Sequence, residues 1–304
     1  MKYLLALAFG TLVCNLLFSQ SLSRTGFKAL QQKEDSMIPL SWRIVQGINT
    51  SDRFEADSQF TRIFVRALAI QNSFEFPFDS LQTISKIYPP DSSFRIFTWQ
   101  LLVNENLVRQ HGAIQMKTSD GSLKLFPLID KSDVTENPED TIADNFGWIG
   151  AVYYKVIEKE YKGKPYYTLL GYDENNIRST KKIVEVLHFE NGKPEFGGHF
   201  FSIPNNNALP RNPARYVIEF KKDASPRLNY DPELDLIVME HLVSESNQPQ
   251  KKWTLIPDGD YEALKWRNGK WVYIDKIFNQ VTPEGKAPVP NPYGESKLKP
   301  NAEN

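Results

Sequence analysis

The chain has 304 residues, of which 40% are hydrophobic and 12% aromatic, and its formal net charge is −1. This content of apolar side chains is sufficient for a large core that needs no disulfides. Acidic and basic residues are interspersed along the sequence, so we expect no cationic surface and no nucleic-acid partner.

The first 20 residues, MKYLLALAFGTLVCNLLFSQ, begin with the basic Lys2, continue with an apolar run over residues 3–18 and end in polar residues. The apolar run is shorter than the roughly 20 residues that a membrane-spanning helix needs. The pattern predicts a secretory signal peptide over residues 1–20, cleaved near Gln20. We therefore expect an exported protein, periplasmic or extracellular, and no ATP-driven or NAD-dependent chemistry.

Cys14 is the single cysteine of the sequence and lies within the expected signal peptide. A lipoprotein signal with Cys14 as the lipidated residue is the alternative, but Val13 stands where a small residue is required. Cleavage near Gln20 leaves a mature chain without disulfides or thiolate ligands. The glycine motifs that bind phosphates and dinucleotides do not occur either, so we expect no cofactor.

Residues 21–90 are expected to form an N-terminal helical segment. Residues 56–71, ADSQFTRIFVRALAIQ, carry apolar side chains at helical spacing and predict one helix. A second, shorter helix is predicted over residues 79–87, because polar cap residues begin it and the prolines at 89–90 end it.

After Pro90 the hydrophobic pattern changes to the alternation that is typical of strands. In RYVIEFKK, residues 215–222, the apolar Tyr216, Ile218 and Phe220 share one face, as expected of a strand with one buried face. The residues between them, from Arg215 to Lys221, share the other face. Asn-Gly pairs at 191–192 and 268–269 predict two-residue type I′ hairpins, since both central residues of that turn need positive φ.

The expected strands cover residues 94–103, 107–117, 122–129, 149–159, 164–172, 181–190, 193–197, 215–222, 234–243, 252–256, 261–267 and 270–277. They predict a mainly β (α+β) fold, in which an antiparallel β-meander of about 10 to 12 strands over residues 91–281 follows the helical segment. Residues 203–214, rich in Asn and Pro, are expected to form a surface loop. Residues 282–304 are proline-rich and polar, and we expect them to be disordered.

The acidic stretch over residues 130–140 is a second expected surface loop. Its Asp130, Asp133 and Glu136 are candidate oxygen ligands for calcium. Their spacing does not match the regular calcium-binding loop. We therefore favour a solvated acidic loop and expect no metal site.

Two histidines are the candidates for catalysis or metal binding. His188 and His199 flank one of the predicted hairpins, so their strands bring them near one another, with Glu185 or Glu195 as carboxylate partner. A buried Glu185 has the raised pKa that is common among catalytic acids. In the alternative, which we favour, the histidines are packed and hydrogen-bonded, and the face of Glu185 borders solvent or an arginine such as Arg178 satisfies its carboxylate.

Aromatic side chains are the candidates for ligand binding. In the tyrosine pairs at 153–154 and 166–167, neighbouring rings point to opposite faces of a sheet, so one ring of each pair either leaves the core or enters a second one. Exposed rings can stack on sugars or anchor a protein, whereas buried rings pair across strands in a two-layer core, which is the interpretation we favour. The candidate residues for binding are Tyr154, Tyr167, Trp266 and Trp271.

In the block YTLLGYDENNIRSTKKIVEVLHFENGKPEFGG and the earlier FGWIGAVYYKVI, the sequence resembles exported β-rich proteins of unknown function from Bacteroidota. The resemblance covers the β-rich half, and the signal peptide ending LFSQ is of a style that implies a Gram-negative cell envelope. It implies no activity, because no catalytic residues are established for those proteins.

These observations favour a non-catalytic binding or interaction module of the cell envelope, with a protein or a saccharide as its partner. The alternative is a periplasmic hydrolase or metal-dependent enzyme that uses His188, His199 and nearby carboxylates. A scaffold role, in which the tail tethers the domain to a larger assembly, is a third hypothesis.

Overall fold

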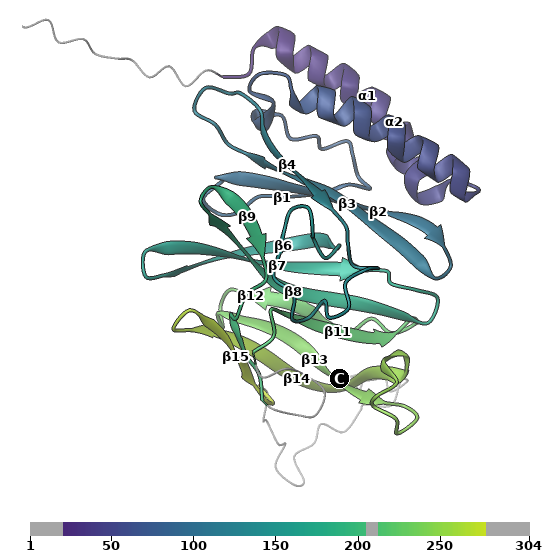
Figure 1. Cartoon of the computed structure of the whole chain (residues 1–304), viewed down its shortest axis with the longest axis vertical. Coiled ribbons are helices and arrows are strands. Elements are labelled where there is room, and N and C mark those ends of the chain that lie inside the picture. Colours follow the sequence, from purple (N-terminus) through teal and green to yellow (C-terminus); the bar gives the residue numbers. More distant parts are fainter. Residues whose placement is uncertain (1–20, 205–211, 278–304) are drawn as a thin grey trace, which may run out of the picture.

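The computed structural model describes residues 21–204 and 212–277, and in these residues the chain is mainly β. Two helices and three β-sheets stack as four layers, with the helix pair at one end of the stack (Figure 1). We call the sheets the N-terminal, the central and the C-terminal sheet. The β-rich α+β fold expected from the sequence is confirmed, whereas the expected signal peptide over 1–20 and the tail over 282–304 lie outside the described residues.

The helix pair consists of α1 (Arg24–Gln46) and α2 (Thr50–Leu68). The side chains of Ser23 and Asn49 accept hydrogen bonds from backbone N–H groups of the first turns, which fixes where both helices begin. The helix predicted over 56–71 is confirmed as part of α2. Apolar residues of the pair pack on the N-terminal sheet, and they are Leu30, Met37, Leu40, Ile44, Ala56, Phe60, Phe64, Ala67 and Leu68.

The helix predicted over 79–87 is wrong. These residues form turns and the strand β1 (Ser85–Ile87). The backbone N–H of Ser80 donates to Oε1 of Glu34 on α1 (2.8 Å), and the side chains of Leu81 and Ile84 are buried in the core under the helices. Tertiary contacts therefore override the local helical pattern.

The N-terminal sheet has the order β1-β2-β3-β4. Its remaining strands are β2 (Phe94–Asn104), β3 (Leu107–Met116) and β4 (Lys124–Ile129). Phe97 on β2 packs against the helices, and Phe94, three residues earlier, packs against the central sheet. Both faces of this sheet are therefore covered.

The central sheet branches at β8 (Ser179–Glu190). Along one edge β8 pairs with β7; along the other it pairs with β11 over its first half and with β9 over its second half. The expected meander therefore ends at β9, because β11 returns to the central sheet after an excursion. The other strands are β5 (Ala143–Asp144), β6 (Val152–Tyr161), β7 (Lys164–Asp173), β9 (Lys193–Phe196) and β11 (Arg215–Lys221).

The C-terminal sheet has the order β10-β15-β14-β13-β12, antiparallel except for the short pair β10–β15. Its strands are β10 (Phe201–Ser202), β12 (Leu228–Asp231), β13 (Leu236–Ser244), β14 (Leu255–Arg267) and β15 (Lys270–Ile274). The Asn-Gly hairpins at 191–192 and 268–269 are confirmed, since all four residues have positive φ.

The strand predicted over 261–267 and the last two residues of the one predicted over 252–256 form one strand, β14, with a bulge between them. Residues 252–254 form a short 3₁₀ helix instead. Glu240 is opposite Tyr261, and Leu242 is opposite Pro257, so three residues of β14 lie across from His241 alone. The central residue of those three, Gly259, has φ 94°. A bulge of this kind bends the strand and redirects the neighbouring side chains.

We predict that Gly259→Ala lowers the free energy of unfolding by about 1–2 kcal/mol, because a residue with a Cβ is strained at positive φ. A Cβ at this position meets no atom within 4 Å, so backbone strain alone causes the loss. Gly147→Ala is the matched control, since its Cβ makes only ordinary contacts at 3.8 Å and its φ is not positive. Urea unfolding measures both, and equal stabilities of the two variants contradict the prediction.

Candidate functional site

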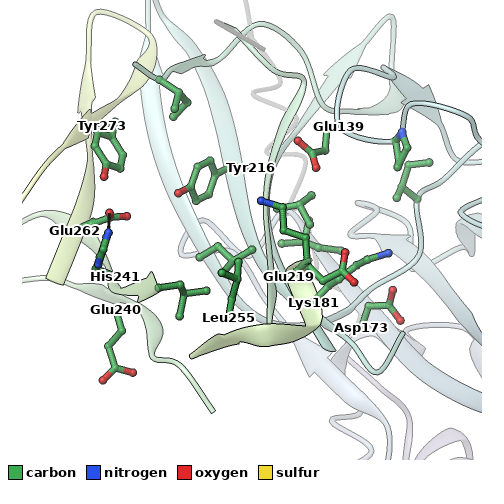
Figure 2. A pocket seen from close by; sticks show the side chains of 18 of the residues that line it. Glu139, Asp173, Lys181, Tyr216, Glu219, Glu240, His241, Leu255, Glu262 and Tyr273 are labelled. Carbon is green, nitrogen blue, oxygen red and sulfur yellow. Dashed lines mark ion pairs between the residues drawn. The ribbon is translucent and has the colours of Figure 1, made fainter. Parts of the chain in front are cut away.

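A cavity of about 650 Å³ lies around β11. It extends from the space between the central and the C-terminal sheet, where Tyr216 and Leu255 line it, to the opposite face of β11, where Val217 and Glu219 line it. Its wall is formed by β8 and β11 on one side, by β13, β14 and β15 on the other, and by the loop that precedes Thr141 (Figure 2). Carboxylates outnumber the cationic side chains on this wall. The ionisable residues that line it are Glu139, Asp173, Lys181, Tyr216, Glu219, Glu240, His241, Lys252, Glu262, Tyr273 and Asp275.

One end of the cavity, which we call the Glu139 end, consists of Glu139, Asp173, Lys181 and Glu219 (Figure 2). Asp173 is buried and accepts hydrogen bonds from Nε2 of Gln110 (3.0 Å) and from a backbone N–H. Burial raises the pKa of Asp173 and of Glu139. Both carboxylates are therefore held in surroundings that do not fully compensate their charge.

The opposite end, which we call the Glu262 end, consists of His241, Glu262 and Tyr273 (Figure 2). The bulge places His241 between two carboxylates: its Nδ1 lies 2.8 Å from Oδ2 of Asp258, and its Nε2 lies 3.7 Å from Oε1 of Glu262. The Tyr273 hydroxyl is hydrogen-bonded to Glu262. Burial raises the pKa of Glu262 despite that hydrogen bond.

Tyr216 lies between the two ends (Figure 2). The residue is only 7% exposed, and none of the described residues hydrogen-bonds to its hydroxyl. Burial raises the pKa of this hydroxyl, and the negative charges of Glu262 and Glu139 raise it further. The hydroxyl oxygen itself is not fully buried, so it can be reached from the cavity, where a ligand can form a hydrogen bond with it.

A buried ion pair fixes the backbone that forms the cavity wall at the Glu139 end. Arg215 on β11 donates through Nε to Oε2 of Glu185 on β8 (3.1 Å), and neither side chain is exposed to solvent. Nη1 of Arg215 also donates to the backbone oxygens of Pro138 and Thr141, on both sides of Glu139. The ion pair therefore fixes the loop that carries Glu139.

Glu185, a catalytic candidate of the sequence analysis, does not line the cavity. It accepts hydrogen bonds from Arg215 and from the Tyr153 hydroxyl, which in turn accepts one from Nε1 of Trp148 (2.7 Å). The expected neutralising residue was wrong, because Arg178 stacks on the ring of Trp253 at 4.5 Å instead. Glu185 is thus a structural carboxylate in the core.

The two candidate histidines have separate partners and do not line the cavity. Nε2 of His188 lies 3.1 Å from Oε1 of Glu195, its cross-strand neighbour and one of the two expected carboxylates. Nδ1 of His199, on an exposed side chain, lies 3.1 Å from the backbone oxygen of Asn212. The hairpin thus brings His188 to a carboxylate but does not join it with His199 in one site.

The candidate metal ligands have separate structural contacts. Asp130 is buried and its carboxylate accepts hydrogen bonds from backbone N–H groups, including those of Gln110 (2.8 Å) and Gly150 (3.2 Å). Asp133 forms an ion pair with Arg109 (2.7 Å), and Glu136 is exposed. Within residues 21–204 and 212–277, no three His, Cys, Asp or Glu side chains are arranged to hold a metal ion.

The candidate aromatic residues mostly fill the cores on the two faces of the central sheet. Trp271 is buried and donates to Oγ1 of Thr168 (2.8 Å), and Trp266 packs against it. Tyr167 is buried, and its hydroxyl donates a hydrogen bond to Oδ2 of Asp91 (2.7 Å). Tyr154 is 39% exposed, but its hydroxyl donates to the backbone oxygen of Leu228. The four residues therefore form no common patch, in agreement with the two-layer core.

No protein-family model matches this chain, and comparison with the curated proteins and with the solved structures finds no match. Among the described residues, neither helix has the length and apolar character that crossing a membrane requires. The function therefore has to be inferred from the site itself.

We predict that Glu185→Gln destabilises the fold by about 3–5 kcal/mol, because it leaves the buried Arg215 cation without its counter-charge. The matched control is Glu195→Gln, which removes a partly exposed pair with His188 and changes stability by less than about 1 kcal/mol. Urea unfolding of both variants measures the difference, and a loss below 1 kcal/mol for Glu185→Gln (roughly the surface-pair value) refutes the assignment.

We predict that Glu139→Gln stabilises the protein at pH 7. Burial and the nearby Asp140 and Glu219 raise the pKa of Glu139, while Lys181 and Lys252 partly offset this. The folded state therefore binds the proton more tightly than the unfolded state, and stability decreases as the pH rises above the unfolded pKa of roughly 4.3.

Thermal melting at pH 7 and at pH 3.5 (about one unit below that unfolded pKa) tests this prediction. The variant melts higher than the parent at pH 7, and the difference vanishes at the lower pH, where both states are protonated. Glu136→Gln, from an exposed position in the same loop, is the control and leaves both curves unchanged. A lower melting temperature for Glu139→Gln at pH 7 contradicts the prediction.

Proposed function

We propose that this protein is a non-catalytic binding module of the cell envelope, which takes a small cationic molecule into the cavity around β11. The observation that carries the proposal is the combination of carboxylates at both ends with the unpartnered Tyr216 hydroxyl between them. The cavity volume of about 650 Å³ is in the range of small-molecule sites.

A bound cation supplies positive charge beside the carboxylates of the cavity wall. Glu139, Asp173 and Glu262 have pKa values raised by burial, so their ionised forms are incompletely stabilised by the protein alone. An ammonium group next to such carboxylates forms charge-assisted hydrogen bonds, which are stronger than neutral ones. In the complex, these hydrogen bonds offset the unfavourable desolvation of the carboxylates.

The sequence alone suggested a protein or a saccharide as the partner. The excess of carboxylates on the wall favours a cationic group over a neutral sugar, and a basic side chain of a protein offers the same chemistry as a small amine. Export to the periplasm or the extracellular space remains part of this proposal and is supported by the signal-peptide pattern of residues 1–20.

A hydrolase is the second candidate, and one observation favours it. Asp258 holds Nδ1 of His241, as a carboxylate does that orients a histidine for general base catalysis, and Nε2 lies at the cavity, 3.7 Å from Oε1 of Glu262. An enzyme at this site would use His241 rather than His188 or His199. Hydrolysis of p-nitrophenyl acetate that is lost in His241→Gln supports this candidate, and equal rates for both proteins and for buffer exclude it for esters.

We predict that hexylamine binds to the protein and that hexanoate, which has the same chain and the opposite charge, does not. Each charge-assisted contact contributes about 1.5–3 kcal/mol, which is roughly 10- to 150-fold in affinity. The variant at the end that the amine occupies, Glu139→Gln or Glu262→Gln, therefore weakens hexylamine binding by about that factor. Isothermal titration calorimetry at pH 7 measures both ligands.

The control variant is Glu195→Gln, whose carboxylate lies outside the cavity and which is expected to bind hexylamine like the parent. Melting curves establish that each variant is folded. Binding of hexanoate as tightly as hexylamine, or no change in either cavity variant, refutes the proposed function.

A further inference from the structure

The carboxylates of the cavity are divided between two ends that belong to different parts of the chain. Glu139 comes from the loop beside the central sheet, whereas Glu262 comes from β14 of the C-terminal sheet, and the two lie on opposite sides of the cavity (Figure 2). A single ammonium group can contact one end only. The other end then keeps its uncompensated carboxylate.

Negative charge is in excess at each end. At the Glu139 end, three carboxylates face Lys181 and the neighbouring Lys252. At the Glu262 end, His241 is shared between Glu262 and Asp258, so even a protonated imidazole leaves one negative charge. Both ends therefore favour a cation.

The middle of the cavity is apolar apart from one hydroxyl. Ile218 and Leu255 line it and belong to the buried core between the two sheets. The Tyr216 hydroxyl lies beside them without a hydrogen bond from the described residues. The negative charges of Glu262 and Glu139 both raise its pKa. A chain that joins two cations across this region is thus expected to be apolar, with a polar group where it passes Tyr216.

We propose that the ligand is a linear polyamine: one terminal ammonium group at each end of the cavity, an apolar chain between them, and a central ammonium that donates to the Tyr216 hydroxyl. This assignment rests on the proposed function, because it specifies the ligand of the same cavity. It adds that recognition requires both ends at once and that Tyr216 distinguishes a polyamine from a simple diamine.

Four probes separate these requirements. Hexylamine has one cation, and the series from 1,4-diaminobutane to 1,8-diaminooctane has two at increasing distance. Spermidine matches 1,8-diaminooctane in the number of chain atoms but carries a secondary ammonium within the chain. Butane-1,4-diol is a neutral control for the chain itself.

We expect the best-fitting diamine to bind at least about 10-fold more tightly than hexylamine, because it makes a second charge-assisted contact. Glu139→Gln and Glu262→Gln each reduce diamine affinity to the level of hexylamine. Tyr216→Phe lowers the affinity for spermidine about 10-fold and leaves that for 1,8-diaminooctane unchanged, since only spermidine uses the hydroxyl. Calorimetry at pH 7 measures all combinations.

The outcomes distinguish the two proposals. If hexylamine and every diamine bind equally well, the proposed function is supported and recognition by both ends of the cavity is refuted. If none of the amines binds, both the proposed function and the two-ended recognition are refuted. If diamines bind tightly but spermidine has no advantage that Tyr216→Phe removes, the central contact is wrong. Should Glu262→Gln fail to fold, Glu139→Gln and Tyr216→Phe still decide the question, and melting curves identify that case.

Discussion

The ion pair between Glu185 and Arg215 is the interaction on which the architecture around the cavity depends. It joins β8 to β11 inside the central sheet, out of contact with solvent. Burial of an ion pair contributes little net stability, so its main consequence is geometric. We interpret the pair as the device that sets β11 on β8 and, through the carbonyl oxygens of Pro138 and Thr141, holds Glu139 at the cavity.

The stacking of four layers explains why the candidate aromatic residues are structural. Both faces of the central sheet are covered, so rings such as Trp271 and Tyr167 pack inside two separate cores. At the cavity, by contrast, the layers enclose ionisable groups whose pKa values are raised by burial. Nearby hydrogen bonds and cations compensate this burial only in part, and such groups are candidates for a functional site.

Local patterns predicted those elements whose formation depends on neighbouring residues. The helix within α2 and the Asn-Gly hairpins follow from side-chain spacing and turn chemistry. The helix over 79–87 failed because its apolar residues are held by the helix pair and its backbone by Glu34. The Asn-Gly hairpin places Glu195 beside His188, as its register predicts, whereas the ionisable groups of the cavity come from strands far apart in the sequence.

The sequence by itself determined the fold class, the hairpin turns and the alternation that buries Tyr216, because each of these depends on residues close together in the chain. Only the tertiary structure decided that β11 returns to β8, that a bulge turns His241 toward Glu262, and that Glu139 lies across from them. These features depend on contacts between segments far apart in sequence, which periodicity does not encode.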